Sequence, residues 1–117
     1  MNYSTRFWES IDQLVANAKV VIDRPAHTAH PRYPDFIYPL DYGYLEDTTS
    51  GDNGGIDVWR GSLSEQKATG VICTVDLTKR DSEIKILLGC TPAEMQVILQ
   101  THNTYTQAGV LIVREEE

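Results

Sequence analysis

GVICTVDLTKRDSEIKILLGC, residues 70–90, is the stretch that decides the fold. It holds two apolar runs rich in β-branched residues, at 70–77 and 83–90, joined by the polar segment TKRDS. Short runs of this composition are typical of strands, and a connection of this length joins antiparallel neighbours. The stretch therefore predicts a β-hairpin, and the other elements can be placed outward from it.

On its N-terminal side the sequence predicts one helix and three short strands. Apolar residues recur on one face over residues 5–17, which is typical of an amphipathic helix. Strands are expected at 20–22, at 37–45 and at 56–60. Residues 23–37 hold three of the five prolines and two of the three histidines, so we expect this segment to be irregular.

On the C-terminal side, Thr91, Pro92 and Glu94 supply the N-cap, the first-turn proline and the capping-box acid of a second helix. A last strand is expected at 110–114. Short strands with a helix at each end indicate a mainly β, α+β domain over residues 1–117. We expect a small five-stranded OB-type barrel, because closure removes exposed strand edges; an open α+β sheet is the alternative.

The composition argues against several classes of protein. A chain of 117 residues with 41% hydrophobic content suits one domain with one modest core. The net charge of −7 and the lack of a basic patch argue against nucleic-acid binding. No apolar run is long enough to span a membrane and the N-terminus carries no apolar signal segment, so we expect a cytoplasmic protein. The two cysteines, Cys73 and Cys90, lie in apolar runs and are expected to be reduced core thiols.

Acidic residues concentrate between Arg32 and Arg60, where the sequence has six acids and no Lys or Arg. Within this region Asp52 and Asp57 flank the glycines of GDNGGIDV. Glycine permits a sharp turn that can bring two carboxylates onto one ion, and Mg²⁺ takes oxygen ligands. Asp-Asn-Gly-Gly is also an ordinary turn, and an acidic stretch can simply face water. Both interpretations are open from these residues alone.

Four blocks follow one another along the chain. They are V-V-I-D-R-P (20–25), Arg32-Tyr33, Y-P-x-D-Y-G-Y-L (38–45) and S-G-D-x-G-G-I-D-V (50–58). In this order they resemble the soluble family I inorganic pyrophosphatases, over about residues 20–90. The resemblance implies a barrel on which several Mg²⁺ ions, with Mn²⁺ as a substitute, hold pyrophosphate and activate a water for attack on phosphorus.

The resemblance also implies four carboxylate ligands for the metal ions. These are Asp52, Asp57, Asp76 and Asp81. Asp57 is expected to bridge ions, and it is therefore a catalytic candidate as well. Glu83 replaces Asp81 if the later acidic stretch is aligned on Lys85, so Glu83 stays open as an alternative ligand.

For the substrate, the resemblance implies that Arg32, Tyr42 and Lys85 contact phosphate groups, and that Tyr42 is also an active-site residue. The sequence departs from the family at the middle acid of its signature, which helps to orient the attacking water and falls at Gly54 here. A phosphate-binding arginine and a C-terminal Tyr-Lys pair have no counterpart. Their candidate replacements are His27, His30, Lys79 and Arg80.

The expected function is Mg²⁺-dependent hydrolysis of inorganic pyrophosphate, a small phosphoanhydride, by a homo-oligomer such as the family usually forms. The alternative is a catalytically weak or inactive module that binds metal and phosphate, which the glycine at position 54 motivates. An OB-type oligonucleotide binder is a third interpretation, and the negative charge of the chain argues against it.

Overall fold

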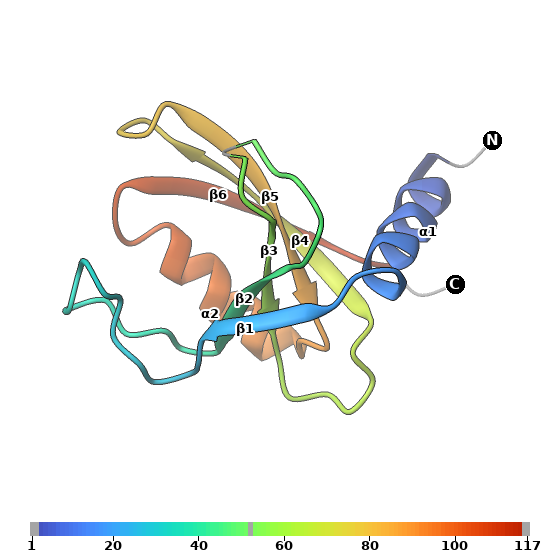
Figure 1. Ribbon diagram of the computed structural model, residues 1–117, viewed down its shortest axis with the longest axis horizontal. Coiled ribbons are helices and arrows are strands. Elements are labelled where there is room, and N and C mark those ends of the chain that lie inside the picture. The colour runs from blue at the N-terminus through green and yellow to red at the C-terminus, as the bar shows by residue number, and fades with distance from the viewer. Residues whose placement is uncertain (1–2, 52, 116–117) are drawn as a thin grey trace.

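Among the residues that the structure describes, six strands form one mixed sheet and two helices pack beside it (Figure 1). The structure is a computed structural model and describes residues 3–51 and 53–115. The elements are α1 (Tyr3–Ala16), β1 (Val20–Arg24), β2 (Asp41–Leu45), β3 (Ile56–Arg60), β4 (Ala68–Asp76), β5 (Asp81–Leu88), α2 (Pro92–His102) and β6 (Gln107–Val113). The expected α+β class with a majority of strands is confirmed.

The strand order is β1-β2-β3-β5-β4-β6, and this order leaves β1 and β6 at opposite edges. All neighbours are antiparallel except β3 and β5, which run parallel. The prediction of a closed five-stranded barrel is therefore wrong, and the alternative prediction of an open α+β sheet is confirmed. The reason lies in β6, which pairs with β4 from Gly70↔Val113 to Asp76↔Gln107 and does not reach β1.

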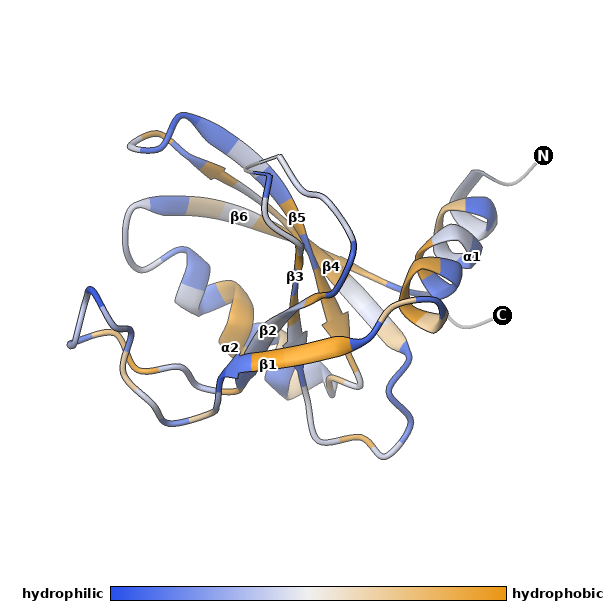
Figure 2. Ribbon diagram, in the orientation of Figure 1, coloured by the Kyte–Doolittle hydropathy of each residue, from blue (hydrophilic) through white to orange (hydrophobic). Residues whose placement is uncertain are grey.

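Two hydrophobic clusters form on the two faces of the sheet, because side chains alternate along each strand. On β3, Val58 belongs to the cluster under α1 and its neighbour Trp59 to the cluster under α2. Val71 and Ile72 divide in the same way on β4. Figure 2 shows apolar residues concentrated in the body of β4 and β5, whereas the tip of their hairpin is mainly hydrophilic. The predicted single core is therefore split by the sheet.

The start of α2 follows the sequence prediction. The Thr91 side chain accepts a hydrogen bond from the Glu94 backbone N–H, and the Glu94 carboxylate accepts one from the Thr91 N–H at 2.8 Å. The same carboxylate accepts from the Ser62 N–H at 3.2 Å, which ties the helix to the loop after β3. This anchoring matters for the site, because it fixes where the last turn of α2 carries His102.

Residues 25–40, here called the 25–40 arm, connect β1 to β2 and lie beside α2 (Figure 1). The arm folds back on itself through backbone hydrogen bonds from His27 to Tyr38, at 2.7 Å, and from Tyr38 to Thr28, at 3.0 Å. The strand expected at 37–45 begins only at Asp41, because Pro39 has no N–H to donate to a neighbouring strand. None of the described helices has the length and apolar content needed to cross a bilayer.

Candidate functional site

A cleft of about 910 Å³ opens between the 25–40 arm, strands β2, β3 and β5, and the turn from α2 to β6. Acidic residues reach it from β3, the end of β4 and β5, and also from β1 and the arm through Asp23 and Asp35, whereas basic residues reach it mainly from β1, the arm and the β4–β5 turn. The cleft therefore combines oxygen donors and cations, which come from segments far apart in the sequence.

Lys85 lies at the bottom of the cleft and is only 5% exposed. Its ammonium donates to the Asp57 carboxylate at 2.7 Å and to the Tyr42 hydroxyl at 3.1 Å, and lies 3.5 Å from the Glu83 carboxylate. The parallel pairing of β3 with β5 puts Asp57 and Lys85 side by side, one residue before the paired Val58 and Ile86. The sheet itself thus builds a buried ion pair into the cleft.

The Tyr42 hydroxyl stays protonated in this position. Burial raises its pKa well above the usual value, and the negative charges of Asp57 and Glu83 raise it further. The hydroxyl accepts a hydrogen bond from Lys85 and donates one to Asp57. Tyr42 therefore acts as a neutral hydrogen-bonding group between a cation and an anion.

A second chain of hydrogen bonds leads from the core to the end of β4. The Trp59 indole N–H donates to His102 Nε2 at 3.0 Å, so the proton of the ring lies on Nδ1, which donates to Gln107 Oε1 at 2.7 Å. Burial lowers the pKa of His102 to about 4, and the nearby Lys85 lowers it as well. His102 is therefore neutral, and Gln107 in turn contacts Asp76.

Asp76 closes the β4–β5 turn as well as facing the cleft. Its carboxylate accepts hydrogen bonds from the backbone N–H groups of Thr78 at 2.9 Å and Lys79 at 3.1 Å. The hydrogen bond from Lys79 is the main cause that lowers the pKa of Asp76, and Thr78 and Gln107 add to it. Asp76 is therefore a carboxylate whose orientation is already fixed by the turn.

Basic side chains form what we call the cationic side of the cleft: Arg24, Arg32 and Lys79. His30 lies among them, and its Nδ1 accepts hydrogen bonds from the backbone N–H groups of Arg32 and Tyr33. Burial lowers the pKa of His30, and the three cations lower it further, so a neutral His30 adds no charge of its own. The Arg24 guanidinium also hydrogen-bonds the Tyr38 hydroxyl.

The structure brings most of the sequence-predicted residues together. The predicted residues that line the cleft are Arg32, Tyr42, Asp57, Asp76 and Lys85. Glu83 lines it as well, whereas Asp81 lies outside it, where it pairs across the hairpin with Asp76. Asp52 lies outside the described residues. Gly54 belongs to an exposed turn in which its carbonyl accepts from the Ser50 N–H at 2.8 Å.

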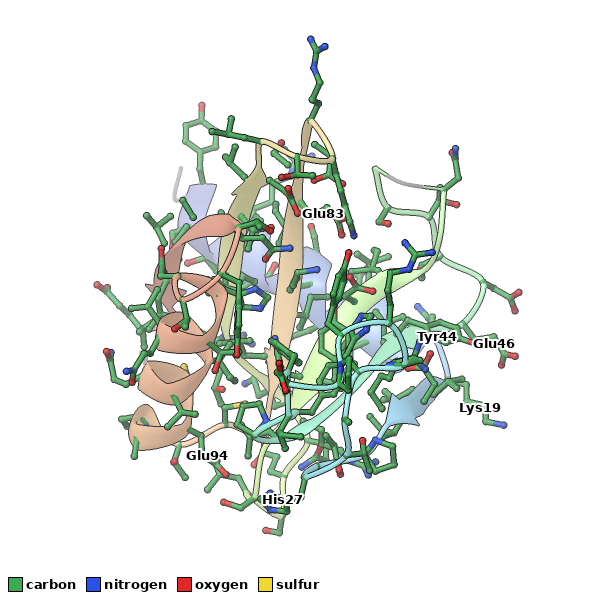
Figure 3. All side chains as sticks on the ribbon, turned by 90° about the vertical axis from the view of Figure 1, so that its left-hand side faces the viewer. Lys19, His27, Tyr44, Glu46, Glu83 and Glu94 are labelled. Carbon is green, nitrogen blue, oxygen red and sulfur yellow. The ribbon has the colours of Figure 1, made fainter. Side chains whose placement is uncertain are left out.

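The sequence suggests four residues as replacements for the missing phosphate-binding arginine and Tyr-Lys pair. Of these, His30 and Lys79 line the cleft. His27 lies at the opposite end of the molecule from Glu83, as Figure 3 shows. Sequence reasoning missed Arg24 and Gln107, because no spacing rule connects them to the acids. His102 stood near the place of the absent Tyr-Lys pair, and only the tertiary structure shows that it contacts Trp59.

The described residues hold no group of three or more His, Cys, Asp or Glu side chains placed to bind a metal ion. Mg²⁺ does not require such a cage, because it is usually held by one or two carboxylates, waters and phosphate oxygens of the substrate. Asp57, Asp76 and Glu83 all line the cleft and supply the oxygen donors that Mg²⁺ prefers. The donor set fits an ion that is held jointly with a phosphate ligand.

Solved structures that share this fold include two bacterial inorganic pyrophosphatases. An inorganic pyrophosphatase from Coxiella burnetii matches with a TM-score of 0.59 and 13% identity, over 83% of this chain and 84% of that chain. The inorganic pyrophosphatase of Helicobacter pylori matches with a TM-score of 0.58 and 14% identity, over 80% and 81%. No protein-family model matches the sequence, and no curated protein sequence is similar to it. Identity this low establishes shape alone: the chain has the fold of these bacterial inorganic pyrophosphatases.

Proposed function

We propose that the cleft binds inorganic pyrophosphate together with Mg²⁺, for which Mn²⁺ can substitute, and that the chain hydrolyses it to two phosphates. The observation that carries this proposal is the meeting of Asp57, Asp76 and Glu83 with Lys85 and the cationic side in one cleft. The pyrophosphatase fold supports it. Two strands at the cleft, β2 and β3, also lie in blocks of sequence that resemble that family. A highly charged phosphoanhydride requires both kinds of group, cations for its oxygens and carboxylates for the metal.

The residues of the chain divide the task between the two sides of the cleft. Asp57 and Asp76 would hold Mg²⁺, and Glu83 would complete the donor set. The ion supplies charge neutralisation and a bound water of lowered pKa. On the opposite side, the planar Arg32 guanidinium can donate two parallel hydrogen bonds to one phosphate group. Tyr42, which stays protonated, can donate a hydrogen bond to a phosphate oxygen when it releases Asp57.

The glycine at position 54 sets an expectation for the rate. In the family that the sequence resembles, an acid in this place helps to orient the attacking water. Removing a positioned base costs roughly 10²–10⁴-fold in rate. Turnover slower than that of an enzyme with all three signature acids is therefore part of the proposal.

The test is release of phosphate from pyrophosphate with Mg²⁺, with Mn²⁺ and with excess chelator. We expect release with either metal and none with the chelator. Asp57→Asn should remove at least about 99% of it, while the matched Glu9→Gln, on the exposed face of α1, should leave it unchanged. A folded protein that releases no phosphate with either metal contradicts hydrolysis.

One observation favours a second function, that of a phosphate-binding module without turnover. Lys85 already occupies one oxygen of Asp57 at 2.7 Å, and a metal ion has to share or displace that contact. Under this alternative, calorimetry shows saturable binding of pyrophosphate while no phosphate is released. Lys85→Met would then weaken pyrophosphate binding, because the cation at the bottom of the cleft is removed, and hydrolysis by the wild type would exclude the alternative.

A further inference from the structure

We propose that the same cleft accepts a nucleoside polyphosphate, with the phosphates between Lys85 and the cationic side and the base against aromatic side chains of the arm. The inference rests on the proposed function for its phosphate end. It goes beyond that function by naming a larger class of ligand, in which a planar heterocycle is attached to the phosphoanhydride.

An aromatic series runs continuously from the rim of the cleft to the buried ammonium of Lys85. The ring centroids of Tyr105 and Phe36 are 5.3 Å apart, those of Phe36 and Tyr38 are 4.9 Å apart, and those of Tyr38 and Tyr42 are 5.5 Å apart. The Tyr42 hydroxyl then lies 3.1 Å from Lys85 Nζ. A ligand that lies along this series has its apolar end at the rim and its anionic end at the bottom.

The aromatic rings at the rim of the cleft are exposed and are not buried in the hydrophobic core. Tyr33 is 60% exposed and Tyr105 is 59% exposed, whereas Tyr38 farther along is 5% exposed. The two exposed rings come from different segments, the 25–40 arm and the turn after α2, yet both line the cleft. Exposed aromatic rings beside cations can bind a single nucleotide. The base stacks on the aromatic ring, as every base can, and the phosphates contact the cations.

The size and charge of the cleft agree with such a ligand. Its volume of about 910 Å³ is near the upper end of the range for small-molecule sites, roughly 300–1,000 Å³. Pyrophosphate has no apolar part and would make no apolar contact with Tyr33, Phe36 or Tyr105. A long nucleic acid is disfavoured by the net charge of −7, so a single nucleotide is the form that suits both halves of the cleft.

The experiment compares ADP with methyl diphosphate, which has the same diphosphate ester but no nucleoside, by calorimetry of the full chain with Mg²⁺. We expect ADP to bind about 5- to 150-fold more tightly, the range of one base–aromatic stack. Tyr105→Ala and Tyr33→Ala should each remove most of this difference and leave methyl diphosphate binding unchanged. Tyr105→Phe should retain it, and Tyr3→Ala, at a 75% exposed tyrosine of α1, is the matched control.

Equal affinities of the wild type for ADP and methyl diphosphate overturn the inference and leave the proposed function intact. A Tyr105→Ala variant that weakens both ligands equally overturns it too, since the ring then supports the site as a whole. If neither compound nor pyrophosphate binds, the proposed function fails together with it. Thermal melting of each variant verifies that the exposed substitutions leave the fold unchanged.

Discussion

At the scale of single residues, Lys85 makes a testable contribution to stability. Its side chain is 6% exposed and faces Asp57 and Glu83, whose side chains are 24% and 8% exposed. Replacing it in Lys85→Met leaves two carboxylates close together without their cation, which should lower the free energy of unfolding by about 3–5 kcal/mol. Urea denaturation measures this loss. Adding Mg²⁺ should restore part of it in the variant, because a divalent cation can take the place of the ammonium.

The control for Lys85 is Arg60→Met. Arg60 pairs with Asp41 at 2.8 Å, but the side chains are 40% and 30% exposed, so water screens the pair and its loss should cost about 1 kcal/mol or less. Equal losses in the two variants would mean that burial does not set the strength of the Lys85 contacts. A Lys85→Met protein that Mg²⁺ leaves unchanged would speak against a cation site at Asp57.

The lowered pKa of His102 predicts that the stability of the fold depends on pH. Its pKa is about 4 in the folded chain, below the ordinary value of about 6.5, so between these values the unfolded chain binds a proton that the folded chain does not. The free energy of unfolding should therefore fall as the pH drops through this window, by on the order of 2–3 kcal/mol. Denaturation at pH 7.5 and 4.5 measures the fall. His102→Gln should reduce it, whereas His27→Asn should not; identical profiles for all three proteins would contradict the assignment.

Several residues of the site could be predicted because strand alternation and block order act locally. Tyr42, Asp57 and Lys85 each lie on a strand that the sequence identifies, and their side chains meet because those strands pair. His102 and Gln107 could not be predicted to join Asp76. Their contacts depend on how the turn after α2 returns the chain to β4, and no local pattern encodes that path.

At the scale of elements, two substitutions in the β4–β5 turn can distinguish a structural role of Asp76 from a metal-binding role. Its carboxylate caps the turn, and an amide can accept the same backbone hydrogen bonds. We expect Asp76→Ala to lower the melting temperature by roughly 5–10 °C and Asp76→Asn by less than half as much. Both should reduce Mg²⁺-dependent phosphate release to the same extent, because an amide is a poor metal ligand. An active Asp76→Asn protein would leave Asp76 with the turn role alone.

The helices and strands themselves show where sequence patterns succeed. All six segments expected as strands contain strands, and 56–60 matches β3 in full. The capping box at Thr91 fixed the start of α2, since it is a contact between neighbours in the sequence. Boundaries shifted where tertiary pairing decides them: β6 begins at Gln107 and not at 110, because Asp76 at the end of β4 offers it a partner.

At the scale of the whole molecule, the sequence could not show whether the sheet closes. Closure would require β1 and β6 to pair, and no local pattern reveals such a pairing. The open sheet leaves apolar side chains of β4 and of the edge strand β6 in solvent, including Val75, Val110 and Ile112 at 50%, 62% and 47% exposure. Exposed apolar groups on adjacent strands are unusual in a monomer. They are consistent with the expected homo-oligomer, which stays a prediction together with the absence of nucleic-acid and membrane partners.

The molecule as a whole should respond to its ligand through the 25–40 arm. The arm carries Arg32 while the sheet carries Asp57 and Lys85, so a phosphoanhydride held by both would join them. Trypsin cleaves after exposed Arg32. Mg²⁺ with a non-hydrolysable pyrophosphate analogue at about 100 times its Kd should slow that cut by up to about 100-fold. Peptide mapping over time gives both rates. Lys67, in the exposed loop between β3 and β4 and outside the cleft, is the control site. Equal protection at Lys67 would indicate stabilisation of the entire fold, and only slower cutting at Arg32 alone supports a ligand that bridges arm and sheet.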